Sequence, residues 1–171
     1  EVHAAGTSYA AFTMDANRGC DHLSVQFNNQ SSINSNRISW DWDLGNGNHS
    51  PLPNPSAIYT QGSYTVKLTA KDDAGNTYTY TDFIIVYENP SPSIDLSNIK
   101  DGCEPDYSVT LTSKTAGVYY HWYCEQLEPR NRYDTIGSMT LSNLTNNTYN
   151  VALEVTDANG CSATTNYSPL F

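Results

Sequence analysis

Clustered carboxylate and amide side chains give two segments of this chain the means to hold a cation. The residues are Asp41, Asp43, Asn46 and Asn48 in one segment and Asp72, Asp73 and Asn76 in the other. Oxygen donors of this kind are the ligands that Ca²⁺ takes in proteins. However, neither segment has the Asp-x-Asp-x-Asp-Gly spacing of a calcium loop, and both are ordinary turn sequences. We therefore predict no metal site and no cofactor, and we keep calcium at these turns as the alternative.

The histidines and carboxylates do not form a recognisable catalytic set. The histidines are His3, His22, His49 and His121, and no two of them have metal-ligand spacing. The sequence contains no Gly-x-Ser-x-Gly elbow, no His-Glu-x-x-His and no phosphate-binding loop. Asp41 and Asp43 share the outward side of one strand, whereas acid–base hydrolysis needs two carboxylates that face each other. We predict that the chain is not an enzyme.

Two tyrosines in the segment 77–87 are the candidate binding residues. If Phe83 points into the core, the alternation of the strand turns Tyr78 and Tyr80 outward. If Ile84 points into the core instead, the same alternation buries both tyrosines. A β-bulge between the two halves would reconcile the patterns. If both tyrosines face outward, they form an aromatic stripe that could hold a sugar ring or the edge of a protein partner.

Charge and composition exclude several classes of partner. Eighteen acidic and eight basic residues among 171 give a net charge of −10. Such a charge repels nucleic-acid phosphates and anionic lipids. No apolar run reaches the roughly 18 residues that a membrane span needs. We expect no nucleic-acid binding and no membrane insertion, and the Tyr-, Thr- and Asn-rich composition suits an extracellular β-protein.

Strands must position all of these residues. Apolar and polar residues alternate over Ile38–Leu44 and again over Tyr64–Ala70, which is the period of half-buried strands. No segment keeps helical periodicity over ten residues. The sequence therefore predicts an all-β protein.

An internal repeat divides the chain. Gly19-Cys20 is matched by Gly102-Cys103, Trp40-Asp41-Trp42 by Tyr120-His121-Trp122, and Tyr64-Thr65-Val66 by Tyr149-Asn150-Val151. The boundary falls at Glu88–Pro92, where two prolines stiffen the connection. We expect one domain over residues 1–89 and a divergent copy over residues 90–171, placed in line.

The segment Trp42-Asp43-Leu44-Gly45-Asn46-Gly47, followed by Gly62-Ser63-Tyr64-Thr65-Val66, resembles the PKD (polycystic kidney disease) domain family. The family hallmark is Trp-Asp-Phe-Gly-Asp-Gly followed by Gly-x-Tyr-x-Val. The resemblance implies two immunoglobulin-like (PKD-type) β-sandwiches in tandem. Paired Gly-Cys signatures also resemble PKD repeats of Bacteroidetes surface proteins, including gliding-motility adhesins and cargo of type IX secretion.

This fold implies structural roles for the large aromatic residues. Trp42 and Trp122 are expected in the two cores. Trp40 is also inward by parity, but two tryptophans on one face are bulky, so one of them is expected at the rim. Tyr64 and Tyr149 are expected to be tyrosine corners, whose hydroxyls bind a nearby backbone group.

Four cysteines allow three pairings, and the sequence alone does not choose between them. In the implied fold, Cys20 and Cys161 lie at the ends that stacked domains bring together, and Cys103 and Cys124 lie at the same end of the second domain. We therefore predict the bonds Cys20–Cys161 and Cys103–Cys124. The alternative is Cys103–Cys161.

Glycosylation acceptors are also present. Asp134-Thr135-Ile136 resembles the O-glycosylation site of Bacteroidetes, which makes Thr135 the candidate acceptor. Asn-x-Ser/Thr sequences begin at Asn29, Asn48, Asn143, Asn146 and Asn166.

Three functions compete. The first is a non-catalytic structural or adhesive spacer of a larger surface or secreted protein, with other domains, surface proteins or glycans as partners. The second is an accessory substrate-binding domain of a secreted glycanase or protease. The third is a subunit of an extracellular filament or secretion assembly that pairs through an edge strand.

Overall fold

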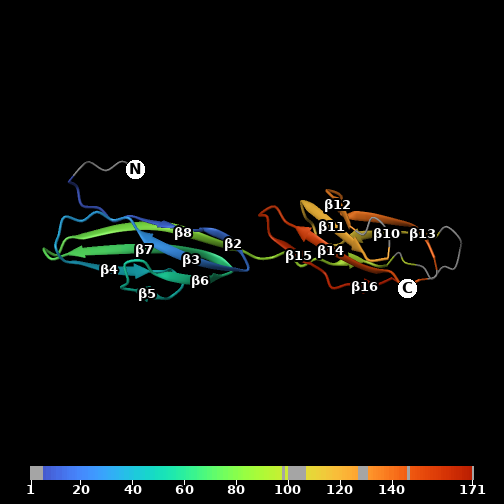
Figure 1. Ribbon diagram of the computed structural model, residues 1–171, viewed down its shortest axis with the longest axis horizontal. Helices are drawn as coiled ribbons and strands as arrows, with labels where there is room; N and C mark the ends of the chain where they lie inside the picture. Colours follow the sequence, from blue (N-terminus) through green and yellow to red (C-terminus); the bar gives the residue numbers. More distant parts are fainter. Residues whose placement is uncertain (1–5, 98, 100–106, 127–130, 146, 171) are drawn as a thin grey trace. The chain divides into compact units, whose positions relative to one another are not determined.

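The computed structural model describes residues 6–97, 99, 107–126, 131–145 and 147–170, and for residues 131–133 it describes the backbone alone. The described residues form strands and no helix (Figure 1). The chain divides into two units, Glu1–Glu88 and Asn89–Phe171. The division lies within one residue of the boundary expected from the sequence.

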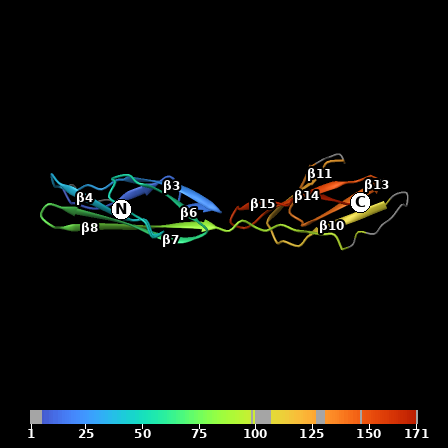
Figure 2. The same ribbon diagram turned by 90° about the horizontal axis from the view of Figure 1, so that it is seen from below.

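Eight described strands form the first unit. They are β1 (Phe12–Met14), β2 (Arg18–Cys20), β3 (His22–Asn29), β4 (Ile38–Asp43), β5 (His49–Ser50), β6 (Ser56–Thr60), β7 (Gly62–Asp72) and β8 (Thr77–Tyr87). One sheet has the order β1-β3-β6 and the other the order β2-β8-β7-β4-β5. Figure 2 shows β3 in one layer and β7 with β8 in the other. The pairing is antiparallel except between β2 and β8, which run parallel. The unit is a β-sandwich.

Alternation along the strands decides what this sandwich buries. In β3, Val25 and Phe27 are fully buried between exposed neighbours. Trp42 from β4 is also fully buried, with its ring centroid 4.9 Å from that of Phe12 and 5.4 Å from that of Phe27. Trp40 packs against this core but is only partly buried. The core position expected for Trp42 is confirmed, and Trp40 is the less buried of the two tryptophans.

Strand β8 has no bulge, so that expectation is wrong. β7 and β8 pair along their whole ladder without a register shift. The parity of the buried Ile84 therefore holds for the entire strand, and Phe83 is left 61% exposed on the outer face. The continuous hydrogen-bonded ladder outweighs the local preference of Phe83 for burial.

Eight described strands also form the second unit. They are β9 (Ile94–Asp95), β10 (Tyr107–Ser113), β11 (Tyr119–Cys124), β12 (Asn131–Asp134), β13 (Ser138–Leu144), β14 (Asn150–Thr156), β15 (Ser162–Thr164) and β16 (Ser168–Pro169). The sheets have the orders β13-β10-β9 and β12-β11-β14-β15, and β16 pairs with β14. The second unit is thus also a sandwich of a three-stranded and a five-stranded sheet, and the fold-class prediction of two sandwiches is confirmed.

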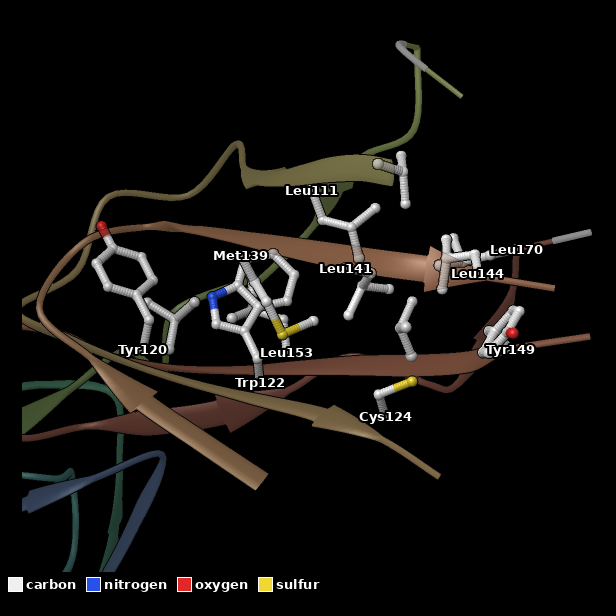
Figure 3. Close-up of a cluster of buried hydrophobic side chains, with 13 residues drawn as sticks. Leu111, Tyr120, Trp122, Cys124, Met139, Leu141, Leu144, Tyr149, Leu153 and Leu170 are labelled. Atoms are coloured by element: carbon white, nitrogen blue, oxygen red, sulfur yellow. The ribbon is translucent and has the colours of Figure 1, made fainter. Parts of the chain in front are cut away.

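Trp122 lies at the centre of the second core, as predicted. Its side chain is fully buried, and Figure 3 shows it among the side chains of Met139 and Leu153. Trp122 is opposite Leu153 in the β11–β14 register. It therefore occupies the place in this unit that Trp42 occupies in the first.

The predicted tyrosine corners are present in both units. The hydroxyl of Tyr64 donates to the carbonyl of Thr60 at 2.9 Å. The hydroxyl of Tyr149 accepts the backbone N–H of Thr145 at 2.9 Å. In each case the backbone partner lies four residues upstream, although the Tyr64 hydroxyl donates and the Tyr149 hydroxyl accepts.

The turns after β7 and β14 are also equivalent. A carboxylate oxygen of Asp72 accepts the N–H of Asn76 at 2.8 Å, and one of Asp157 accepts the N–H of Cys161 at 2.9 Å. Hydrogen bonds lower the pKa of Asp72, and the bond from the side-chain amide of Asn76 has the largest effect. Hydrogen bonds also lower the pKa of Asp157, and the bond from the backbone N–H of Cys161 has the largest effect there. The matching turns support duplication of one domain.

The buried Tyr59 is expected to make the first unit less stable at alkaline pH. Its hydroxyl is buried and donates to the carbonyl of Leu44 at 2.8 Å. Burial, with smaller contributions from Tyr64 and Asp43, raises the pKa of Tyr59 from 10.0 to about 12. The folded unit therefore keeps a proton that the unfolded chain has lost. We expect the free energy of unfolding to fall by up to about 2–3 kcal/mol as the pH rises from about 10 to about 12.

Denaturant unfolding followed by tryptophan fluorescence between pH 9 and 12 measures this loss. The Tyr59→Phe variant is the control, because it removes the ionisable group and keeps the ring. An identical pH dependence in the variant would show that Tyr59 does not cause the loss.

Candidate functional site

A cavity of about 620 Å³ lies against the five-stranded sheet of the second unit. Strands β11, β12 and β14 and the turn after β12 supply its walls. The lining residues are Tyr119, Tyr120, His121, Asp134, Thr135, Glu154 and Thr156. The cavity thus combines aromatic rings with carboxylates and hydroxyls.

A row of rings on β11 forms one side of this site. Tyr119, His121 and Tyr123 alternate with core residues such as Trp122, so they lie on the outer side of the sheet. The ring of Tyr119 is 61% exposed. The ring centroids of His121 and Tyr123 are 4.0 Å apart, with an angle of 36° between the ring planes. An aromatic surface of the kind expected on β8 is therefore found on β11.

Glu154 fixes two of these rings. It lies directly opposite His121 in the β11–β14 register. Its Oε2 accepts a hydrogen bond from the Tyr123 hydroxyl at 3.1 Å and lies 3.3 Å from Nδ1 of His121. His121 is only 8% exposed. The three side chains form one connected polar group in the middle of the sheet face.

Thr135, the predicted glycosylation acceptor, lies at the cavity. It is exposed in the turn after β12, and the preceding Asp134 accepts the N–H of Ile136 at 3.1 Å. An exposed turn leaves its hydroxyl accessible. The modification itself stays a prediction.

The candidate binding residues of β8 do not form the expected outward stripe. Tyr80 packs on the core, and its ring centroid lies 5.0 Å from that of Phe12 in an edge-to-face contact. The hydroxyl of Tyr78 donates to Asp72 at 3.4 Å. Both rings share the side of β8 that faces the core, so the outward orientation proposed for Tyr78 and Tyr80 is wrong.

The first cluster of oxygen donors shapes its own turn. Asp43 accepts the backbone N–H two residues ahead at 3.0 Å, and Oδ1 of Asn46 accepts the N–H of Asn48 at 3.2 Å. Asp41 lies 3.4 Å from the ring of His49. These side chains are therefore engaged with the protein.

The second cluster is engaged in the same manner. Asp72 is bound by Asn76, and Asp73 accepts the hydroxyl of Ser35 at 2.8 Å. In the part of the chain that the structure describes, no group of three or more His, Cys, Asp or Glu side chains could hold a metal ion.

The structure shows the oxidation state of two cysteines. Cys20 and Cys161 are both disulfide-bonded, which is the state that the predicted Cys20–Cys161 bond requires. Cys124 is buried in the core of the second unit. Cys103 lies outside the described residues, so the Cys103–Cys124 bond stays a prediction.

Non-reducing peptide mapping is expected to recover a peptide that joins Cys20 to Cys161. A bond between these residues closes a loop of more than a hundred residues. The chain-entropy model predicts that such a bond stabilises the folded state by about 4–5 kcal/mol. The same digest after reduction is the control. A peptide that joins Cys103 to Cys161 would contradict the pairing.

The profile of the PKD domain family matches residues 10–86, which contain nearly all of the described strands of the first unit. Over 66 residues the chain is also 44% identical to the pre-pro-metalloprotease PrtV of Vibrio cholerae. The first unit belongs to the PKD domain family. The aligned segment is 37% of this chain and spans only 7% of the length of that relative.

Solved structures similar to this chain include two other PKD domains. The PKD1 domain of the Vibrio cholerae metalloprotease PrtV is 38% identical, with coverage of 47% of this chain and 96% of that domain and a TM-score of 0.41. The PKD1 domain of Vibrio anguillarum Epp is also 38% identical, with coverage of 47% and 94% and a TM-score of 0.41.

The PKD turn of the first unit depends on Gly45. This residue has φ +74°, and a Cβ atom there would overlap the carbonyl of Thr65 on β7. The preceding Leu44 is buried, with its N–H bound to the carbonyl of Asn48. Leu44 thus fills the core position of the family's Phe, while Gly45 lets the turn approach the neighbouring strand.

PKD-type domains are non-catalytic modules. None of the described residues forms a helix that is long and apolar enough to cross a membrane.

Apart from Thr135, the residues that line the cavity were not among the predicted site residues. Tyr119, Tyr120, His121, Trp122 and Tyr123 form an unbroken run of ring-bearing residues, and this run is the signal that could have drawn attention to β11. The contribution of Glu154 depends on the β11–β14 register, which the sequence does not reveal.

Proposed function

We propose that this chain is a non-catalytic extracellular module of a larger cell-surface or secreted protein, where it spaces neighbouring domains and contacts proteins or carbohydrates. The observation that carries the proposal is the extent of the match to PrtV. The matched residues are 37% of this chain but 7% of that metalloprotease. A PKD domain in that relative is a small part of a longer protein, and we infer the same relation here.

An extracellular location is part of the proposal. Cys20 and Cys161 are disulfide-bonded, and structural disulfides persist in oxidising compartments. The net charge of −10 also favours partners other than nucleic acids and anionic membranes.

The second candidate is an accessory substrate-binding domain of a secreted glycanase or protease. The cavity beside Tyr119 favours it, because a ligand-sized hollow with converging polar groups is what such a domain needs. A filament subunit and a gliding-motility or type IX-secreted protein of Bacteroidetes are further proposals. The relatives described above come from Vibrio.

The purified 171-residue chain tests the non-catalytic assignment. Incubated with denatured protein and with neutral and acidic polysaccharides, it is expected to release no new peptide amino groups and no new reducing ends above the blank. A commercial protease and a glycanase serve as positive controls. Turnover that survives repurification would overturn the proposal.

A further inference from the structure

We infer that the cavity beside Tyr119 binds a neutral sugar unit of a polysaccharide. The inference rests on the proposed function and deepens it, because it names the ligand class and the site of contact. The cavity volume of about 620 Å³ lies within the roughly 300–1,000 Å³ of small-ligand sites. It is large enough to receive a sugar ring.

The ring of Tyr119 supplies the apolar surface. It is 61% exposed although it stands on a strand of the central pair β11–β14. A sugar has one face of C–H groups and an edge of hydroxyls, so it can pack its C–H face on an aromatic ring while its hydroxyls point elsewhere. Tyr119 offers such a ring at the cavity wall.

The hydrogen-bonding groups around the ring match hydroxyls. The carboxylate oxygens of Asp134 and Glu154 accept hydrogen bonds, whereas the hydroxyls of Thr135 and Thr156 can accept or donate. Among the described residues, hydrogen-bond donors reach Oδ1 of Asp134 and Oε2 of Glu154. The second oxygen of each carboxylate is therefore left for a ligand, and hydroxyl-to-carboxylate bonds are among the strong ones.

The spacing of the two carboxylates favours a sugar over a single cationic group. Asp134 ends β12 and Glu154 lies on β14, with β11 between these strands. The backbones of these two residues are therefore two strand spacings, or about 10 Å, apart, whereas an ammonium group must lie within about 4 Å of each carboxylate that it pairs with. A ligand that contacts both carboxylates needs donors spread over its body, as a polyol has.

Charge restricts the ligand further. Among the cavity-lining residues that the structure describes, none is Lys or Arg and two are acidic. The whole chain carries a net charge of −10. Sulfated or uronic-acid polysaccharides would therefore be repelled, which leaves neutral sugars.

The site is largely preformed. His121 and Tyr123 stack and share Glu154 as their partner. A carboxylate held in this way loses little conformational freedom when a ligand arrives, so more of the contact energy appears as affinity.

Isothermal titration calorimetry on the full chain tests the inference. The probes are cellohexaose, N-acetylchitohexaose, mannohexaose and xylohexaose, with a heparin hexasaccharide and an oligolysine peptide as charged comparisons. We expect binding to at least one neutral hexasaccharide and a loss of tenfold or more in Tyr119→Ala. Tyr119→Phe, which keeps the ring, is expected to bind nearly as well as the parent chain.

Phe83→Ala is the matched control, because Phe83 is an aromatic residue of the first unit with the same 61% exposure. Its binding should equal that of the parent chain. Thr135→Ala, at an exposed turn, gives a second variant of the cavity wall and is expected to weaken binding. Circular dichroism and thermal melting confirm that each variant is folded.

Three results would overturn the inference. They are no binding to any of the four neutral sugars, equal binding by parent and Tyr119→Ala, and binding to oligolysine or heparin alone. Each leaves the non-catalytic module intact, because that proposal fails only if the chain turns over a substrate.

Discussion

Trp42→Ala is expected to destabilise the PKD unit by about 3–5 kcal/mol, the usual cost of truncating a large buried aromatic residue. The Trp42 side chain is fully buried between the rings of Phe12 and Phe27, which come from the opposite sheet. Its loss leaves a cavity in contact with both layers. Chemical denaturation of the full chain, with the melting of each unit followed separately by NMR, measures the change.

Two matched variants sharpen this test. Trp42→Phe should cost much less, because it keeps a ring and removes a buried indole N–H that has no hydrogen-bond partner in the described structure. Trp122→Ala should destabilise the second unit by a similar 3–5 kcal/mol, because Trp122 is equally buried. A loss under about 1 kcal/mol for either alanine variant would show that the ring is not a core element.

Gly45→Ala is expected to cost the PKD unit about 3 kcal/mol. A non-glycine residue at φ +74° is strained by about 1–2 kcal/mol. In addition, its Cβ would overlap the carbonyl of Thr65, so the turn and β7 must move apart. Denaturant unfolding of the variant measures the total.

Gly47→Ala separates the two causes. Gly47 has a similar φ of +85°, but a Cβ there would have no heavy atom within 4 Å. Its substitution should cost only the backbone strain, about 1–2 kcal/mol. Equal losses for the two variants would show that the contact with Thr65 does not explain why glycine is needed at position 45.

Local pattern was enough to predict the sandwiches, because the strands that decide the fold have one clearly apolar side. Val25, Phe27 and Trp42 alternate with polar residues, and all three are buried as expected. The pattern failed in β8, where Phe83 and Ile84 are both apolar and parity alone cannot choose between them. The ladder with β7 makes that choice, and pairing across strands is not visible in a single segment.

The candidate site was beyond prediction for a related reason. Both sides of β11 carry ring-bearing residues, so neither Tyr119 nor His121 is marked as outward by polarity. The cavity also depends on Glu154, which lies 33 residues from His121 in the chain and meets it only through strand pairing. The turn roles of Asp43 and Asn46, by contrast, could be predicted from the sequence. Asp and Asn side chains accept hydrogen bonds from backbone N–H groups only two residues ahead, so no distant strand is involved.

The parallel pairing of β2 with β8 has a mechanical consequence for the PKD unit. β2 lies near the start of the unit and β8 is its last strand, with the register Arg18↔Ile85 to Cys20↔Tyr87. The bonds Ile85 N–H to Asn17 and Asp21 N–H to Tyr87 extend this contact at both ends. When the disulfides are reduced, so that no bond at Cys20 carries the load past β8, and β1 has been pulled from β3, tension along the chain draws β2 and β8 in opposite directions along their common axis. The bonds between them are then sheared together instead of opening one by one, so the unit should resist stretching until this short patch gives way as a whole.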